Sequence, residues 1–137
     1  DFISEHHGTL ITRYQYNRAL QNTGGEKKKL DEDKFRYPGP SPRSKETALL
    51  MIADGVEARA RAEQPMDEAQ MRHLVRDVIN NRQLDGQLNN TALTQHDLVE
   101  ITDSFIATLQ VTYHPRLEYP QQPPPVDTEP IAKRRKQ

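Results

Sequence analysis

Residues 44–62, SKETALLMIADGVEARARA, decide the fold class, because apolar side chains recur there at the spacing of one face of a helix. Ser44 or a neighbouring residue is the expected N-cap. Asp54 flanks the apolar face, where a carboxylate destabilises the fold unless it is paired, hydrogen-bonded or bound to metal. The segment therefore predicts an amphipathic helix with a candidate site at its edge. The predicted buried positions are Leu49, Ile52, Ala53, Val56 and Ala60.

Three further segments, about residues 2–21, 67–85 and 94–114, predict helices from the same periodicity. Asp67 and Thr94 are the expected N-caps of the last two, because a capping partner follows each of them three residues later. We therefore expect an all-α chain of four helices. The predicted buried positions of the last two helices are Met71, Leu74, Val75, Val78, Ile79, Leu98, Ile101, Phe105, Ile106, Leu109 and Tyr113.

The connection between the first two helices has two parts. Residues 26–34 are rich in charge and predict a solvated or mobile loop. Residues 38–42, PGPSP, exclude a helix and predict a stiff, partly extended segment, because proline lacks an amide hydrogen.

The first predicted helix carries two adjacent histidines, His6 and His7, in the sequence EHHGT. Adjacent histidines are usually solvated. Here, however, His7 shares a helical face with apolar residues, and Asp54 flanks the buried face of the next helix. The residues therefore predict that His6, His7 and Asp54, three potential metal ligands, meet in one cleft. The apolar positions on that face are Ile3, Leu10, Ile11 and Tyr14.

Composition limits the classes of function. The chain has 137 residues, of which 34% are hydrophobic, and ten prolines, so it can form one small core. A net charge of -1 argues against a broad nucleic-acid surface. The longest apolar run, residues 48–53, is far shorter than the roughly 20 residues of a membrane span. Because the chain contains no cysteine, any metal site must use nitrogen and oxygen ligands.

Six blocks of sequence together resemble the C-terminal part of the HD domain in bacterial seven-transmembrane HD-hydrolase receptors. These receptors are membrane-bound phosphodiesterases that cleave cyclic di-AMP. The likeness runs from the first residue to about Pro120, so residues 1–120 are expected to form part of an HD-domain helical bundle. Residues 121–137 are expected to form a disordered proline-rich, basic tail. The blocks are EHHGT (5–9), FRYPGP (35–40), KE (45–46), ADGVEA (53–58), DGQL (85–88) and YHPRLEYP (113–120).

The resemblance implies a centre of two divalent ions whose ligands follow the order His, His-Asp, His, His-His, Asp along the chain. His6 and His7 match the tandem histidines, and Asp54 matches the last aspartate. No His-Asp dipeptide precedes them, and the one that follows, His96-Asp97, is in the wrong order. We therefore expect a segment that begins midway through its domain and holds an incomplete site. The family suits iron or manganese, although the residue types alone leave zinc open.

The activity that the resemblance implies is hydrolysis of a cyclic dinucleotide, with cyclic di-AMP to the linear dinucleotide favoured. No catalytic residue is expected beyond the metal ligands. Arg36, Arg43 and Lys45 are candidate phosphate contacts, and Tyr37 could stack on adenine; the alternative is an ordinary solvated loop. The parent protein is expected at the cytoplasmic face of the bacterial plasma membrane, anchored by segments outside this soluble piece, which alone should be inactive.

Two alternatives stay open. The first is a non-catalytic module in which a degenerate HD fold senses or binds nucleotide without cutting it. The second keeps the chemistry but acts on another cyclic dinucleotide or a nucleotide monoester. The Gly-Tyr-Pro motif of the HD enzymes that act on cyclic di-GMP is absent from the chain, which disfavours that substrate.

Overall fold

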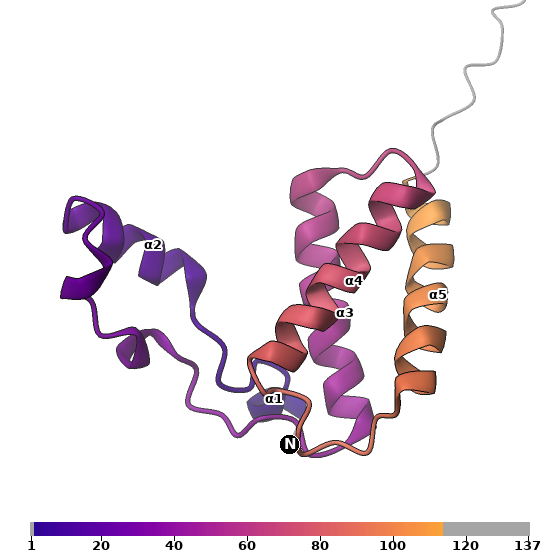
Figure 1. Ribbon diagram of the computed structural model, residues 1–137, viewed down its shortest axis with the longest axis horizontal. Coiled ribbons are helices and arrows are strands. Elements are labelled where there is room, and N and C mark those ends of the chain that lie inside the picture. Colours follow the sequence, from indigo (N-terminus) through magenta and orange to yellow (C-terminus); the bar gives the residue numbers. More distant parts are fainter. Residues whose placement is uncertain (1, 114–137) are drawn as a thin grey trace, which may run out of the picture.

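The computed structural model describes residues 2–113, and helices dominate it (Figure 1). Apart from one isolated bridge between Ile11 and Arg36, this part of the chain contains no β-structure. The all-α prediction is confirmed. The elements are α1 (Phe2–Glu5), α2 (Arg13–Asn22), the 3-10 turns η1 (Lys27–Lys29) and η2 (Glu32–Phe35), α3 (Lys45–Glu63), α4 (Glu68–Leu84) and α5 (Gln95–Thr112).

Helices α3, α4 and α5 lie side by side and form the core, with α4 packed against both neighbours (Figure 1). All five buried positions predicted for α4 are buried, as are three of the six predicted for α5. The other three, Ile101, Phe105 and Tyr113, are partly buried and pack against the same core. The remaining buried apolar residues of this cluster are Ala48, Ile52, Val56, Ala60 and Leu88.

The predicted helix starts are confirmed by their caps. The Ser44 hydroxyl accepts a hydrogen bond from the backbone N–H of Thr47 at 3.2 Å. Asp67 and Thr94 cap α4 and α5 in the same way, with distances of 2.8 Å and 3.1 Å. Because each cap satisfies amides that the first turn leaves unpaired, these helix starts are determined by nearby sequence.

The predicted helix over residues 2–21 is wrong. The chain instead forms the short helix α1, a turn over residues 6–9, an extended connection and then α2. Gly8 has φ +52°, and a Cβ at this position would lie 2.3 Å from Oε1 of Gln87, so the turn depends on close packing against a distant segment. The predicted apolar face fails with the helix, since Ile3 is 90% and Tyr14 74% exposed.

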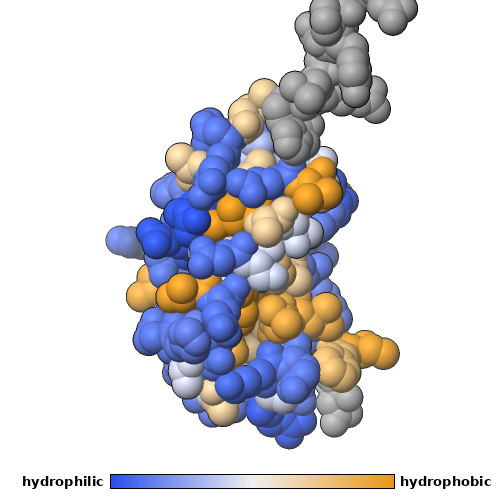
Figure 2. Space-filling view, turned by 90° about the vertical axis from the view of Figure 1, so that its right-hand side faces the viewer, coloured by the Kyte–Doolittle hydropathy of each residue, from blue (hydrophilic) through white to orange (hydrophobic). Residues whose placement is uncertain are grey.

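The buried face of α3 also differs from the prediction. Leu49 is 42% exposed rather than buried, and the adjacent Leu50 is 41% exposed. The buried side of α3 instead includes Ala48 and Met51, and the side chain of Met51 lies against Gly8 in the turn that follows α1. Leu49 and Leu50 instead line an apolar groove between α3 and α5, together with Phe2, Ile101 and Phe105. Figure 2 shows apolar side chains gathered on the face that carries α5.

Helix α2 and the segment between α2 and α3 form an arm beside the bundle (Figure 1). The charged loop contains the two 3-10 turns, and residues 38–42 contain no helix, as expected. Two backbone hydrogen bonds, from Thr12 N to Phe35 O at 2.6 Å and from Tyr37 N to Leu10 O at 2.9 Å, join the two sides of the arm.

Residues 2–113 contain no helix that is long and apolar enough to cross a membrane. The expected tail over residues 121–137 and the end of the last sequence block, residues 114–120, lie outside the described residues.

Candidate functional site

The turn after α1 fixes the ring of His6. Its Nδ1 lies 2.8 Å from the backbone oxygen of Phe2. Because a carbonyl oxygen only accepts, Nδ1 must carry the proton, and the second ring nitrogen, Nε2, is then the lone-pair nitrogen of the neutral ring. A hydrogen bond of this kind on one nitrogen, with the other free to coordinate, is typical of histidines that bind metal.

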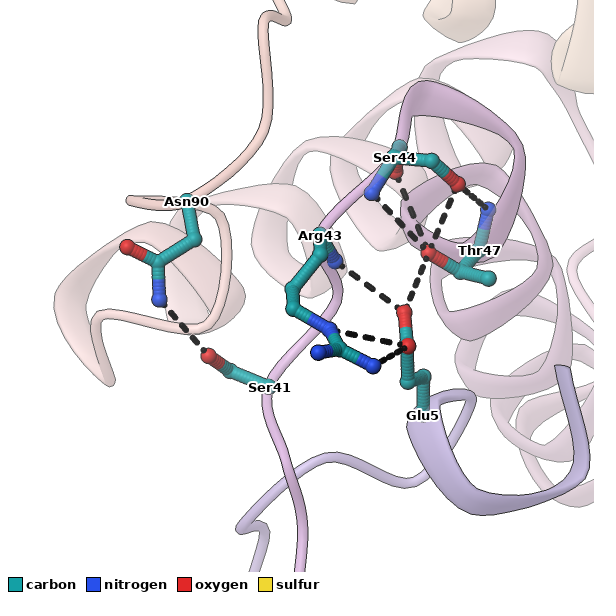
Figure 3. A network of polar contacts seen from close by, with 6 residues as sticks. All are labelled: Glu5, Ser41, Arg43, Ser44, Thr47 and Asn90. Atoms are coloured by element: carbon teal, nitrogen blue, oxygen red, sulfur yellow. Dashed lines mark hydrogen bonds and ion pairs between the residues drawn. The ribbon is translucent and has the colours of Figure 1, made fainter. Parts of the chain in front are cut away.

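Glu5 anchors the same turn to the start of α3 (Figure 3). Its carboxylate is 4% exposed and accepts hydrogen bonds from Nη2 of Arg43 at 2.7 Å, Nε of Arg43 at 3.0 Å and the Thr47 hydroxyl at 3.2 Å. The backbone N–H of Arg43 donates to it at 3.2 Å. The hydrogen bonds from the Arg43 guanidinium lower the pKa of Glu5, although burial opposes them. The residue before the tandem histidines is therefore a structural anchor.

Gln87 holds the other side of this turn. It is 2% exposed, and its Oε1 accepts a hydrogen bond from the backbone N–H of Thr9 at 3.0 Å. Its Nε2 donates to the Thr9 hydroxyl at 2.8 Å and to the backbone oxygen of Asp85 at 3.2 Å. Gln87 lies in the block DGQL but was not predicted to be a functional residue. The sequence signal that could have indicated its structural role is its position directly before the apolar Leu88, which is buried.

The turn brings His7 to Asp54 on α3. Nδ1 of His7 lies 3.9 Å from Oδ2 of Asp54, and both side chains are partly exposed. The His7 ring stacks on Tyr37, with centroids 4.3 Å apart and an interplanar angle of 16°, and lies 3.8 Å from the ring of His6. The ring of His7 thus lies beside both the His6 ring and the Asp54 carboxylate, at a solvent-accessible edge of the bundle. Their role as metal ligands stays a prediction.

The candidate substrate contacts fall into two groups. Arg36 and Tyr37 border the histidine turn, because Nη1 of Arg36 donates to the backbone oxygen of Thr9 at 3.2 Å and Tyr37 stacks on His7. Like Arg36, which also pairs with Asp33, Arg43 and Lys45 are engaged with carboxylates. Arg43 binds Glu5 as described above, and Nζ of Lys45 lies 2.8 Å from Oδ2 of Asp97. The structure therefore places only the first pair beside the histidines.

The ligand set is partial in the described part of the chain. Within residues 2–113, no group of three or more His, Cys, Asp or Glu side chains is arranged to hold a metal ion. The donor types fit a nitrogen and oxygen site, and the Nδ1 hydrogen bond of His6 prepares Nε2 for coordination. His6, His7 and Asp54 thus fit a share of a metal centre. Among the other histidines, His73 and His96 are exposed, and each lies beside a carboxylate of its own helix.

No protein-family model matches the chain. The chain is 36% identical over 121 residues to the cyclic-di-AMP phosphodiesterase PgpH of Bacillus subtilis and 37% identical over 120 residues to PgpH of Listeria monocytogenes. Each comparison covers 88% of this chain but only 16% of the relative. An uncharacterised protein of Synechocystis is 34% identical over 123 residues, which are 15% of its length.

The chain is also similar to solved structures of the PgpH HD domain. The crystal structure of the L. monocytogenes PgpH HD domain matches with a TM-score of 0.70 and 34% identity, covering 82% of this chain and 50% of that one. The same domain in complex with cyclic di-AMP matches with a TM-score of 0.72 and 35% identity, covering 84% and 52%. The chain therefore spans about half of the solved domain, and the resemblance expected from the sequence is confirmed.

Proposed function

We propose that this chain, a homologue of the HD domain of the cyclic-di-AMP phosphodiesterase PgpH, supplies part of a two-metal centre that hydrolyses a cyclic dinucleotide. The favoured reaction converts cyclic di-AMP to the linear dinucleotide. One observation in this chain carries the proposal: the turn after α1 brings His7 within 3.9 Å of Asp54 on α3, while the neighbouring His6 keeps Nε2 available. The relative of known structure was crystallised with cyclic di-AMP.

In the proposed mechanism His6 and His7 would hold one divalent ion and Asp54 would hold the second, with iron or manganese favoured. Such ions, when bound, polarise the phosphodiester and activate a water molecule as the nucleophile. The other residues of the site orient these ligands. The Phe2 carbonyl fixes the ring of His6, Tyr37 covers one face of His7, and Gln87 and Glu5 hold the turn from its two sides.

The complete centre requires residues outside this chain. The chain spans about half of the solved HD domain and 16% of the whole relatives, so we propose that the remaining ligands come from the larger protein. The chain alone should then bind divalent metal weakly and leave cyclic di-AMP intact. In the larger protein, the proposed location of the domain is the cytoplasmic face of the bacterial plasma membrane, with the membrane-spanning segments elsewhere in the sequence.

A non-catalytic sensor is the second candidate. This candidate would be favoured if the part of the protein outside this chain lacked the remaining histidine and His-Asp ligands. In that case the fold binds the nucleotide without cutting it. The phosphodiesterase predicts turnover and bound metal in the complete protein, whereas the sensor predicts nucleotide binding without turnover.

The test measures cyclic di-AMP turnover by the complete protein that contains this segment, with manganese or iron added. We expect turnover, and a loss of at least about 100-fold in His7→Ala and in Asp54→Ala, because each removes a metal ligand. His73→Ala is the matched control, since His73 is exposed on α4 and should leave turnover unchanged. Full activity in both site variants, or robust hydrolysis by the 137-residue chain alone, would contradict the proposal. Nucleotide binding by a metal-free, inactive protein would support the sensor.

A further inference from the structure

Arg82, in the last turn of α4, has a guanidinium with no hydrogen-bond or ion-pair partner within residues 2–113. Its Nε is buried and has no hydrogen-bond acceptor among the described residues. Within residues 2–113 no carboxylate forms an ion pair with its guanidinium either. Three other arginines of the bundle, Arg59, Arg61 and Arg72, each pair with carboxylates. Because a desolvated cation is costly unless it is compensated, the environment of Arg82 indicates a missing anion.

The guanidinium of Arg82 lies against the backbone of Gly55 on α3. A Cβ at Gly55 would lie 2.7 Å from Nη2 of Arg82, so the glycine provides the space that the guanidinium occupies. A glycine in a helix interior weakens the helix relative to alanine. Gly55 directly follows Asp54, whose carboxylate meets His7. The Arg82 guanidinium therefore packs against the residue that follows the candidate metal ligand Asp54 in the sequence.

The surrounding charges do not compensate Arg82. Burial is the largest effect on its pKa and lowers it, and the like charge of Arg13 on α2 lowers it further. Asp85 and Asp54 act in the opposite direction, but neither is within ion-pair distance of the guanidinium. The positive charge of Arg13 thus adds to that of Arg82 instead of neutralising it. An anionic ligand group would therefore be attracted to the Arg82 guanidinium.

We propose that Arg82 is an anion-binding residue that holds a phosphate group of the ligand beside His7 and Asp54. This inference rests on the proposed function, because a phosphodiester would have to lie at these ligands to be cleaved. A guanidinium presents two N–H-bearing nitrogens in a plane that matches two oxygens of one phosphate. The Nη groups would make this contact, since Nε is enclosed by protein. Arg13 adds long-range attraction, and Gly55 keeps the guanidinium in place.

The test measures binding of inorganic phosphate to the 137-residue chain, without metal and at constant ionic strength, by following the arginine side-chain NMR signals. We expect the Arg82 signal to shift with saturation, and the apparent Kd to rise at least tenfold in Arg82→Met. Arg76→Gln is the matched control, because Arg76 is exposed on the same helix and forms no ion pair within residues 2–113. It should bind phosphate like the unaltered chain.

Thermal unfolding separates an anion site from a structural role. If Arg82 binds an anion and does not stabilise the fold, Arg82→Met should raise the Tm of the phosphate-free chain by a few degrees. Added phosphate should then not raise the Tm of this variant further. A structural arginine predicts the reverse, a lower Tm. Arg82→Lys retains the charge and serves as the second variant, with intermediate phosphate affinity.

Two results would overturn the proposal: unchanged phosphate affinity in Arg82→Met, or a phosphate response spread equally over exposed arginines and lysines. The phosphate assay uses no catalysis, so its outcome is distinct from that of the proposed function. If Arg82→Met weakens phosphate binding but the complete protein shows no turnover, the phosphodiesterase is refuted and the anion site is supported. Turnover with a KM unaffected by Arg82→Lys and Arg82→Met would refute the anion site alone.

Discussion

Replacing Gln87 by leucine should release the turn that carries the tandem histidines. Gln87 is 2% exposed, and its amide makes three hydrogen bonds, two to Thr9 and one to Asp85. Leucine fills most of the same space but can make none of them. The variant therefore loses these three hydrogen bonds. It also leaves the backbone N–H of Thr9, a partly buried donor, without its acceptor.

The expected loss follows from these contacts. At about 0.5–1.5 kcal/mol for each hydrogen bond, the free energy of unfolding should fall by about 2–4 kcal/mol. With a urea m-value of about 1–2 kcal/mol/M, the unfolding midpoint should fall by about 1–4 M. The assay is urea unfolding followed by circular dichroism, with the ring signals of His6 and His7 recorded by NMR. Those signals should lose their dispersion at urea concentrations where the helices remain.

Gln83→Leu is the matched control. Gln83 lies near the end of α4, four residues before Gln87, and its side chain makes no hydrogen bond within residues 2–113, so the substitution should change stability by less than about 0.5 kcal/mol. If Gln87→Leu behaves like this control, the amide does not hold the turn, and the position of His7 beside Asp54 must have another cause.

Two further predictions concern the bundle. Ile106→Ala should lower the free energy of unfolding by about 2–5 kcal/mol, because Ile106 is buried in the core, whereas Phe105→Ala should stay below the about 3–5 kcal/mol of a fully buried phenylalanine. Urea unfolding of both variants checks this, and a loss above that range for Phe105 would contradict the partial exposure. Lys45 and the cap of α5 lower the pKa of Asp97 to about 2, so its contribution to stability is present above its ordinary pKa of about 4 and is lost as the pH falls through about 2. Urea midpoints between about pH 5 and pH 2 should fall more steeply for the unaltered chain than for Asp97→Asn, and parallel profiles would refute this.

The three bundle helices could be predicted because their signals are local. Ser44, Asp67 and Thr94 each cap a helix through an amide three residues away, and the apolar stripe of α4 matches its buried face at every expected position. The region before them could not be predicted in this way. Its shape depends on Gln87, 78 positions after Thr9, and this contact requires the left-handed turn at Gly8. Helical periodicity carries no information about such a contact.

The same limit applies to the candidate site. The sequence predicted a common cleft for His7 and Asp54 from a shared helical face, but residues 6–9 form a turn rather than a helix. The two side chains meet because Glu5 and Gln87 fix the turn from opposite sides. The residues were therefore identified through their chemistry and through the resemblance, whereas the geometric reason given for their meeting was wrong.

Arg82 shows why an anion site can escape sequence analysis altogether. An arginine on an amphipathic helix normally keeps its charge in water, so its position in α4 gives no sign of a buried guanidinium. The only signal is Gly55, which weakens a helix interior by about 0.5–1 kcal/mol relative to alanine and so indicates the close approach of some other group. The structure identifies that group as the Arg82 guanidinium. A weakened helix and a desolvated cation thus coincide beside Asp54, and local costs of this kind are expected where a protein binds its ligand.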